Sequence, residues 1–227
     1  MNTYSSKTKS EKVIILSRTP EEIVELSKQK KAYILVNCLP KDFEGWVYIY
    51  CRGGDGTLLR TKKGYKIVPF NDEISHEEFE KADWCNYSII GRFYFKNGLT
   101  YTLQRHRYFG DEIFRHLDGG DYLSSREERW RDRLTKRTGF TFDELWNKGK
   151  KIKVLEPFVI QRDLNIFVAE DIEMLDEPLR FSDFRKYRTV REDKYAVAEQ
   201  QGFILKPPKN WMFAWKDVAL KSLLNGV

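Results

Sequence analysis

Short apolar runs separated by polar turns dominate the chain and predict a fold rich in β-strands. Residues 13–17 read VIILS, residues 32–37 read AYILVN and residues 46–51 read WVYIYC. Runs of this length that are rich in β-branched and aromatic residues are typical of buried strands. The same pattern predicts further strands over residues 65–68, 87–95 and 164–175.

Two adjacent prolines interrupt the last apolar stretch, GFILKPPKNWMFAW at 202–215. Proline fixes its own backbone and removes a hydrogen-bond donor, so a strand does not continue through the pair. The stretch therefore predicts a strand, a rigid turn and a second strand. We interpret Trp211 as a core residue of the second strand.

A helix is predicted directly after the first strand. Thr19 is a suitable N-cap, Pro20 suits the first helical position and two glutamates follow in the first turn. The cations Lys28, Lys30 and Lys31 oppose the negative end of a helix that closes there. Lys31 is thus expected at the solvated end of this helix.

Residues 98–153 carry more charge and fewer long apolar runs, and they are interpreted as a helical insertion. The sequence SSREERWRDRLTKRTG predicts a helix over 124–139 that ends at Gly139. A second helix is expected over 141–149 with Thr141 as its cap. Another short helix, capped by a serine, is expected over 75–82.

The composition is that of a soluble globular protein of 227 residues, with 41% hydrophobic and 33% charged residues. Residues 1–12 are expected to form a disordered leader, residues 13–216 one domain, and residues 217–227 a tail or short helix. No signal peptide and no membrane-spanning run is seen, so a cytoplasmic protein without a membrane partner is expected.

The few cysteines and histidines argue against a disulfide framework and against a metal site. The three cysteines are scattered, and Cys51 and Cys85 are expected to be small core residues. Asp111, Glu112 and His116 suit a metal nuclease on one helical face, but a solvated face is the preferred interpretation. No metal and no cofactor is therefore expected.

A modest positive charge permits a nucleic-acid partner, since 40 Lys and Arg oppose 34 Asp and Glu. In the helix expected over 124–139, four arginines recur at spacings of 3, 4 and 4 and so share one face. Acidic neighbours on the same helix offer the alternative that the arginines only form surface ion pairs. The arginine stripe consists of Arg126, Arg129, Arg133 and Arg137.

Residues 103–109, LQRHRYF, place Arg105 and other cations beside two aromatic residues. Aromatic rings among cations are typical of surfaces that bind single-stranded nucleic acid, since the rings stack on bases and the cations contact phosphates. The glycine-rich stretch RGGDG at 52–56 lacks the Gly-Lys-Ser/Thr ending of a phosphate loop and predicts a turn.

Several stretches in order resemble the ASCH family, small PUA-like β-barrel domains common in bacteria and their phages. The stretches are LSRTP, YIY, IIGRF, DEPLRFSDF and PPKNW, at residues 16–20, 48–50, 89–93, 176–184 and 207–211. The resemblance covers residues 13–95 and 154–216 and leaves 98–153 unexplained. It implies an α+β fold: a PUA-like mixed β-barrel with flanking helices and, here, a helical insertion.

The resemblance also implies a basic cleft at the barrel mouth and, as the leading hypothesis, a non-enzymatic protein that binds RNA or another nucleic acid. The cleft is expected to be lined by Arg18, Lys31, Asn37 and Arg52, with Arg105 and the arginine stripe extending the basic surface. A possible protein partner, for instance a host component bound by a phage factor, is kept as a further alternative.

Some family members hydrolyse the acetyl amide of N4-acetylcytidine, and others have been suggested to be ribonucleases. In this chain Lys31 falls at the hydrolase lysine position, with Glu170 or Glu173 as the accompanying carboxylate. Ile34 and Val36 occupy the threonine and arginine positions of that motif. An isoleucine has no hydroxyl for proton transfer, so catalysis by Lys31 and Glu173 is the alternative rather than the leading hypothesis.

Overall fold

The computed structural model describes residues 9–70, 83–106, 110–116, 122–125, 134–156, 159–186, 201–204 and 206–218. Most of these residues lie in β-strands, and helices are few. The chain divides into two compact units: unit 1 is Met1–Lys28, Gly45–Phe93 and Ile172–Val227, and unit 2 is Gln29–Glu44 and Tyr94–Asp171. The domain expected over 13–216 is thus shared between two units.

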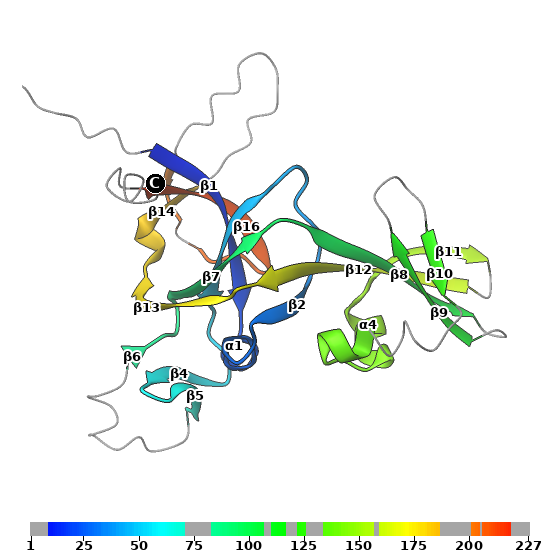
Figure 1. The fold of residues 1–227 in the computed structure, drawn as a ribbon, viewed down its shortest axis with the longest axis horizontal. Helices are drawn as coiled ribbons and strands as arrows, with labels where there is room; N and C mark the ends of the chain where they lie inside the picture. The colour runs from blue at the N-terminus through cyan, green and yellow to red at the C-terminus, as the bar shows by residue number, and fades with distance from the viewer. Residues whose placement is uncertain are drawn as a thin grey trace, which may run out of the picture. The chain divides into compact units, whose positions relative to one another are not determined.

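The main sheet of unit 1 is seven-stranded and curls into a half-barrel (Figure 1). The two central strands, β1 and β3, run parallel, while β16 pairs antiparallel with the other edge of β1. In sheet order the strands are β13 (Glu173–Leu179), β7 (Ile89–Phe95), β3 (Gly45–Cys51), β1 (Lys9–Arg18), β16 (Trp211–Val218), β14 (Phe184–Lys186) and β15 (Gln201–Phe203). A short 3-10 helix, η1 (Phe181–Asp183), precedes β14.

Alternate residues of these strands form the core of unit 1. Val13 and Ile15 of β1 pack with Tyr48 of β3, Phe184 of β14 and Ala214 of β16, and all five are buried. Burying an aliphatic or aromatic side chain contributes about 1.5–3 kcal/mol, so this face holds the sheet in its curled form. The strand, turn and strand expected at the proline pair are confirmed as β15, a turn and β16.

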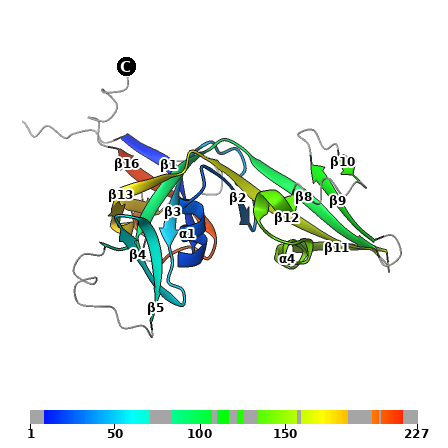
Figure 2. The ribbon, with the colours of Figure 1, turned by 60° about the horizontal axis from the view of Figure 1, so that its bottom comes forward.

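Helix α1 (Pro20–Ser27) follows β1, as predicted, and its start is fixed by a capping box. Thr19 Oγ1 accepts a hydrogen bond from the Glu22 backbone N–H, and Glu22 accepts one from the Thr19 N–H. Buried Ile23 and Leu26 form its packed face. A three-stranded sheet of β4 (Gly56–Thr61), β5 (Gly64–Pro69) and β6 (Asp83–Trp84) lies beside α1 in the order β5-β4-β6 (Figure 2).

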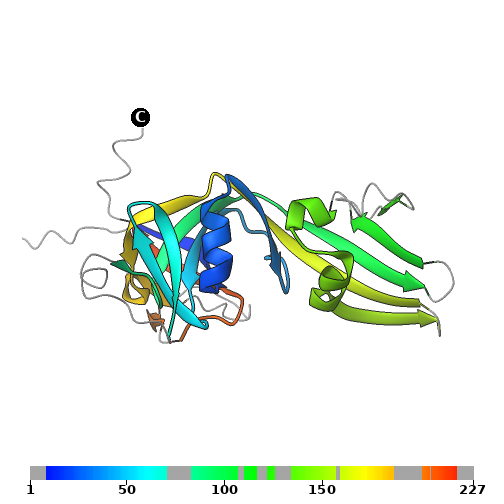
Figure 3. The same cartoon turned by 90° about the horizontal axis from the view of Figure 1, so that it is seen from below.

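Unit 2 is built around one long central strand, β12 (Val159–Glu170). β8 (Gly98–His106) pairs along one edge of β12, while β11 (Lys150–Glu156) and β2 (Lys31–Val36) pair with successive parts of the other edge. β9 (Gly110–His116) and β10 (Tyr122–Ser125) continue the sheet beyond β8. The long neighbouring strands are seen side by side in Figure 3.

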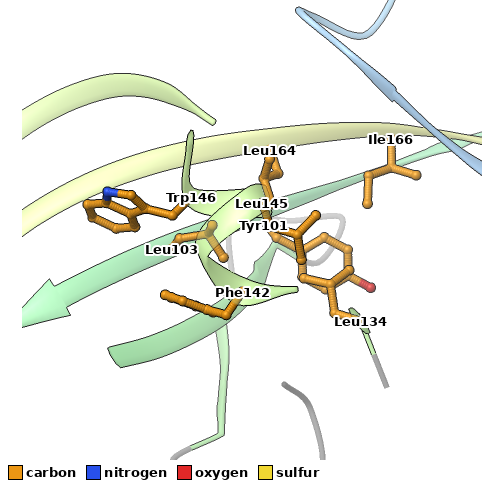
Figure 4. Packing of buried hydrophobic residues seen from close by; sticks show 8 residues of the cluster. All are labelled: Tyr101, Leu103, Leu134, Phe142, Leu145, Trp146, Leu164 and Ile166. Carbon is orange, nitrogen blue, oxygen red and sulfur yellow. The ribbon is translucent and has the colours of Figure 1, made fainter. Parts of the chain in front are cut away.

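One face of this sheet is covered by helical segments. α4 (Phe142–Lys148) has the predicted Thr141 cap, again with a full capping box, and residues 134–138 are also helical. Figure 4 shows the resulting core, in which α4 and Leu134 pack on alternate residues of β8 and β12. The buried residues of this core are Tyr101, Leu103, Leu134, Phe142, Leu145, Trp146, Leu164 and Ile166.

Three predictions of secondary structure are wrong. Residues 98–153 are not a helical insertion, because β8, β9, β10 and β11 occupy most of their described part. The helix expected over 124–139 begins later, since Ser124 and Ser125 lie in β10; residues 134–138 are helical as expected. Residues 9–12, which were expected to belong to the disordered leader, begin strand β1.

Candidate nucleic-acid interface

Lys31 begins strand β2 instead of ending a helix. It lies opposite Glu170 of β12, and its ammonium group donates a hydrogen bond to the Glu170 carboxylate. This bond raises the pKa of Lys31 above its ordinary value and lowers the pKa of Glu170. The two side chains are 49% and 57% exposed, so they form a solvated ion pair in which Lys31 is protonated at neutral pH.

Tyr33, on the same face of β2, brings Lys31 together with Arg137, a second predicted site residue. The Lys31 Nζ atom lies 6.0 Å from the centre of the Tyr33 ring, and the Arg137 guanidinium carbon lies 5.5 Å from it. Arg137 is exposed, and its charge acts against that of Lys31. Two cations of different segments are therefore held beside one ring.

Arg105 of β8 is held against α4 by rings and by a carboxylate. Its guanidinium carbon lies 5.5 Å from the Phe142 ring centre and 4.7 Å from that of Trp146. Nη2 donates a 2.7 Å hydrogen bond to Asp143 Oδ1, and the Arg105 side chain remains 37% exposed. The rings orient the guanidinium while part of it still faces water.

Arg162 of β12 contacts the same Trp146 ring, and it was not identified as a site residue from the sequence. Its guanidinium carbon lies 5.1 Å from the Trp146 ring centre, and Nη1 donates a 2.8 Å hydrogen bond to the Trp146 carbonyl. The only signal in the sequence is that Arg162 alternates with Leu164 and Ile166, which places it on the packed face. The unit 2 cation face, as we name it, consists of Lys31, Arg105, Arg137 and Arg162.

Asn37 follows the end of β2 and is exposed, but its backbone belongs to a polar network on the other face of the sheet. The Asn37 carbonyl accepts a 3.3 Å hydrogen bond from Asn165 Nδ2, and Asn165 Oδ1 accepts one of 3.2 Å from Thr100. Asn165 is five residues from Glu170 along β12, so its side chain points away from the Lys31 face. This contact of the Asn37 carbonyl therefore lies on the face opposite Lys31.

Arg18 and Arg52, the other two residues predicted for the barrel mouth, are close to each other in unit 1. The Arg52 N–H donates a 2.9 Å hydrogen bond to the Arg18 carbonyl. Burial lowers the pKa of Arg18, Arg52 lowers it further, and Glu22, whose carboxylate is 4.0 Å away, raises it. Arg18 is 6% exposed, whereas Arg52 is exposed.

Glu173, the carboxylate predicted to assist Lys31, lies in unit 1, whereas Lys31 lies in unit 2. Its Oε2 accepts a 2.7 Å hydrogen bond from Arg92 Nε, which raises the pKa of Arg92. The Arg92 guanidinium carbon also lies 4.4 Å from the Trp46 ring centre. Within unit 2 the carboxylate beside Lys31 is that of Glu170.

Part of the predicted basic surface lies outside the described residues. This holds for Arg126, Arg129 and Arg133 of the arginine stripe, and for the residues that follow His106 in LQRHRYF. Asp111, Glu112 and His116 lie on strand β9 and not on a helix.

The described part of the chain shows no metal centre and no membrane-spanning helix. Among its side chains, no three His, Cys, Asp or Glu groups gather closely enough to hold a metal ion. None of its helices is long and apolar enough to cross a bilayer. Burial raises the pKa of Cys51 to about 12 and that of Cys85 to about 11, which fits the predicted core role of both thiols.

Unit 1 contains an open pocket of about 310 Å³ lined by Arg60, Thr61, Lys62, Asp83 and Asp176. Arg60 Nη2 donates a 2.7 Å hydrogen bond to Asp83, and Arg60 Nη1 donates one of 2.8 Å to the Leu175 carbonyl. None of the predicted site residues lines this pocket. Comparisons with protein-family models, with curated proteins and with solved structures found no match to this chain.

Proposed function

We propose that the protein binds RNA or another nucleic acid through the unit 2 cation face. The observation that carries the proposal is that each of its four cations lies within 6.0 Å of an aromatic ring centre. Lys31, Arg105 and Arg162 lie on one side of the sheet, and Arg137 lies in the helical segment that covers that side. Such cations are already oriented, so less side-chain entropy is lost when a phosphate binds.

The dimensions of the face suit an extended polyanion. Glu170, the pairing partner of Lys31, and Arg162 are eight residues apart on β12, about 26 Å along the strand. The cations therefore lie on either side of the core that α4 and Leu134 form on this side of the sheet. The rings of Phe142 and Trp146 are 3% and 6% exposed, so they support guanidinium groups and do not offer a face to a base. Contacts with phosphates, which carry no sequence information, are therefore expected to dominate.

The state of Lys31 favours binding over the hydrolase alternative. A general base near neutrality needs a lysine with a lowered pKa, whereas the hydrogen bond to Glu170 raises that of Lys31. As the finer description of unit 1 we propose the PUA-like fold of the ASCH family. Its support is the mixed sheet, in which β1 pairs parallel with β3 and antiparallel with β16, and in which α1 follows β1.

The test is a salt titration of binding to a fluorescently labelled 12-nucleotide RNA of mixed sequence. The double variant Arg105→Gln/Arg137→Gln should bind about tenfold more weakly than the wild type at 100 mM salt. The slope of log K against log salt should fall by about 1.4, because about 0.7 is expected for each lost contact with a single strand.

The matched control is Lys62→Gln/Lys63→Gln, which removes the same charge from the exposed β4–β5 turn of unit 1. It should retain the affinity and slope of the wild type. Equal losses in both double variants would show a mere net-charge effect, and absence of binding at 50 mM salt would end the proposal. Incubation with N4-acetylcytidine tests the hydrolase alternative, since cytidine release lost in Lys31→Ala would favour an enzyme.

A further inference from the structure

The Tyr48 hydroxyl of β3 lies between two cations on the face of the unit 1 sheet that carries its core. Tyr48 is 2% exposed, and its oxygen accepts a 3.0 Å hydrogen bond from Lys216 Nζ of β16. The pKa of Arg92, on β7, is raised by its hydrogen bond to Glu173 and, less strongly, by one to Tyr48. In the sheet, β7 lies on one side of β3, and β1 and β16 lie on the other. The two cations therefore reach one oxygen from opposite sides.

Aromatic rings, and no carboxylate, hold the Lys216 ammonium group in place. Nζ lies 4.5 Å from the centre of the Tyr48 ring and 5.8 Å from that of Phe184, and both residues are buried. Glu11 lies directly opposite Lys216 in the β1–β16 pairing, but no carboxylate of the described residues forms an ion pair with Lys216. Lys216 is half-buried, so its ammonium group keeps two N–H donors and an uncompensated charge.

The Arg92 guanidinium group is oriented by one ring and one carboxylate. Its carbon lies 4.4 Å from the Trp46 ring centre, and Trp46 lies two residues before Tyr48, on the same face of β3. The hydrogen bond to Glu173 uses Nε and compensates the charge of Arg92, which leaves the outer nitrogens for other acceptors. The side chains of Arg92 and Glu173 are 30% and 50% exposed, so a ligand from solution can reach this group.

We propose that Lys216, Arg92 and the Tyr48 hydroxyl form a binding site for a phosphate group. The Tyr48 oxygen accepts hydrogen bonds from both cations, so its own O–H can donate to a third group. An ammonium group, a guanidinium group and a phenol O–H around one point are donors that suit a phosphate dianion. All three residues belong to unit 1, so the site goes beyond the function proposed for the unit 2 cation face.

The number of donors favours phosphate over a carboxylate ligand. A phosphate monoester presents three strong acceptor oxygens, one for each of the three donors, and carries a charge of about −1.5 to −2 at neutral pH. A carboxylate presents only two oxygens and a single charge. Inorganic phosphate and the phosphate group of a sugar phosphate share this chemistry, so both are used as probes below.

Calorimetric titration of the full chain with inorganic phosphate, at neutral pH and low ionic strength, tests the site. Lys216→Gln and Tyr48→Phe should each weaken binding at least about tenfold, because each removes a hydrogen bond to a charged ligand. Lys209→Gln is the matched control, since Lys209 is exposed in the turn before β16, and it should retain the affinity of the wild type. Absence of binding to the wild type, or an unchanged affinity in either site variant, would overturn the proposal.

Melting temperatures with and without phosphate separate a binding role from a structural one. Phosphate should raise the melting temperature of the wild type but not that of Lys216→Gln, because a ligand that binds only the folded state stabilises it. An equal rise in both proteins would make Lys216 a structural residue and overturn the proposal. Ribose 5-phosphate that binds more tightly than inorganic phosphate assigns the site to a sugar phosphate, and equal or weaker binding assigns it to phosphate alone.

The Arg105→Gln/Arg137→Gln variant should bind phosphate with the affinity of the wild type. This result would keep a failure of the phosphate site distinct from a failure of the unit 2 proposal.

Discussion

Two buried rings in unit 2 and one exposed ring in unit 1 offer different surfaces to a ligand. In unit 2 the rings of Phe142 and Trp146 are buried, and Arg105 lies over them with its charge toward water. In unit 1 the Tyr87 ring is itself 66% exposed. A buried ring positions a cation and offers a ligand only charge, whereas an exposed ring also offers a stacking surface.

The largest difference between the two units is expected in the stability of variants that lose an aromatic ring. Phe142→Ala should lower the free energy of unfolding by about 3–5 kcal/mol, because it opens a cavity in the unit 2 core. Tyr87→Ala should change it by less than about 0.5 kcal/mol, because its ring is mostly solvated. Urea denaturation monitored by tryptophan fluorescence measures both, and similar losses would contradict the contrast.

Two glycines provide a second contrast. A Cβ on Gly98 in unit 2 would lie 2.4 Å from the Leu39 side chain and 3.0 Å from the Ile166 carbonyl. Gly98→Ala should therefore cost about 1–3 kcal/mol of unfolding free energy, since that carbonyl is fixed in the sheet. A Cβ on Gly53 would meet only the movable end of the Tyr87 side chain, so Gly53→Ala should lower the unfolding free energy by less in the same urea titration.

The capping boxes offer a comparison in which the two units should behave alike. Thr19→Ala removes the cap of α1, and Thr141→Ala removes the cap of α4. Each substitution should lower the free energy of unfolding by about 1 kcal/mol. Serine at either position should restore most of the loss, because its hydroxyl accepts the same hydrogen bond. Thermal denaturation of the four variants is the measurement. A loss in one unit alone would show that packing, not the cap, fixes the other helix.

The smallest expected effect concerns the Lys31–Glu170 pair. The folded-state pKa of Glu170 is lowered, so its stabilisation is present above the ordinary value of 4.5 and is lost as pH falls through the folded-state pKa. The raised folded-state pKa of Lys31 stabilises the folded protein below the ordinary pKa of lysine, and this stabilisation is lost as pH rises through the folded-state pKa. Both contributions are therefore present between the titration of Glu170 and that of Lys31. NMR titration should show that the pH midpoint of Glu170 rises in Lys31→Met. An unchanged midpoint would show that Lys31 and Glu170 do not form an ion pair in solution.

Local signals in the sequence predicted local structure well. Thr19 and Thr141 were identified as caps because a capping box involves residues only three apart. The strand, turn and strand around the two adjacent prolines follow equally from neighbouring residues. The strands within 98–153 were missed because β8 mixes polar and apolar residues, YTLQRH, and is held by pairing with β9 and β12.

The candidate sites depend on contacts that no local pattern contains. Lys31 faces Glu170 across 139 residues of sequence, so its role in a sheet was not visible from its lysine-rich surroundings. The sequence NYS at 86–88 would favour asparagine in the left-handed position, but Tyr87 adopts it. Arg137 was identified from the spacing of arginines and Arg105 from a run of cations beside aromatic residues, and the rings that contact them became known only from the fold.

The pairing of β2 with β12 has a consequence for synthesis of the chain. The apolar strand KAYILV leaves the ribosome more than a hundred residues before its partner, Asn165–Glu170. At the usual rate of about 5–20 residues per second, β2 waits roughly 7–26 s without its native neighbour. During that interval β2 is an unpaired apolar segment to which chaperones or other chains can bind. The yield of folded protein should therefore depend on how quickly translation reaches Glu170.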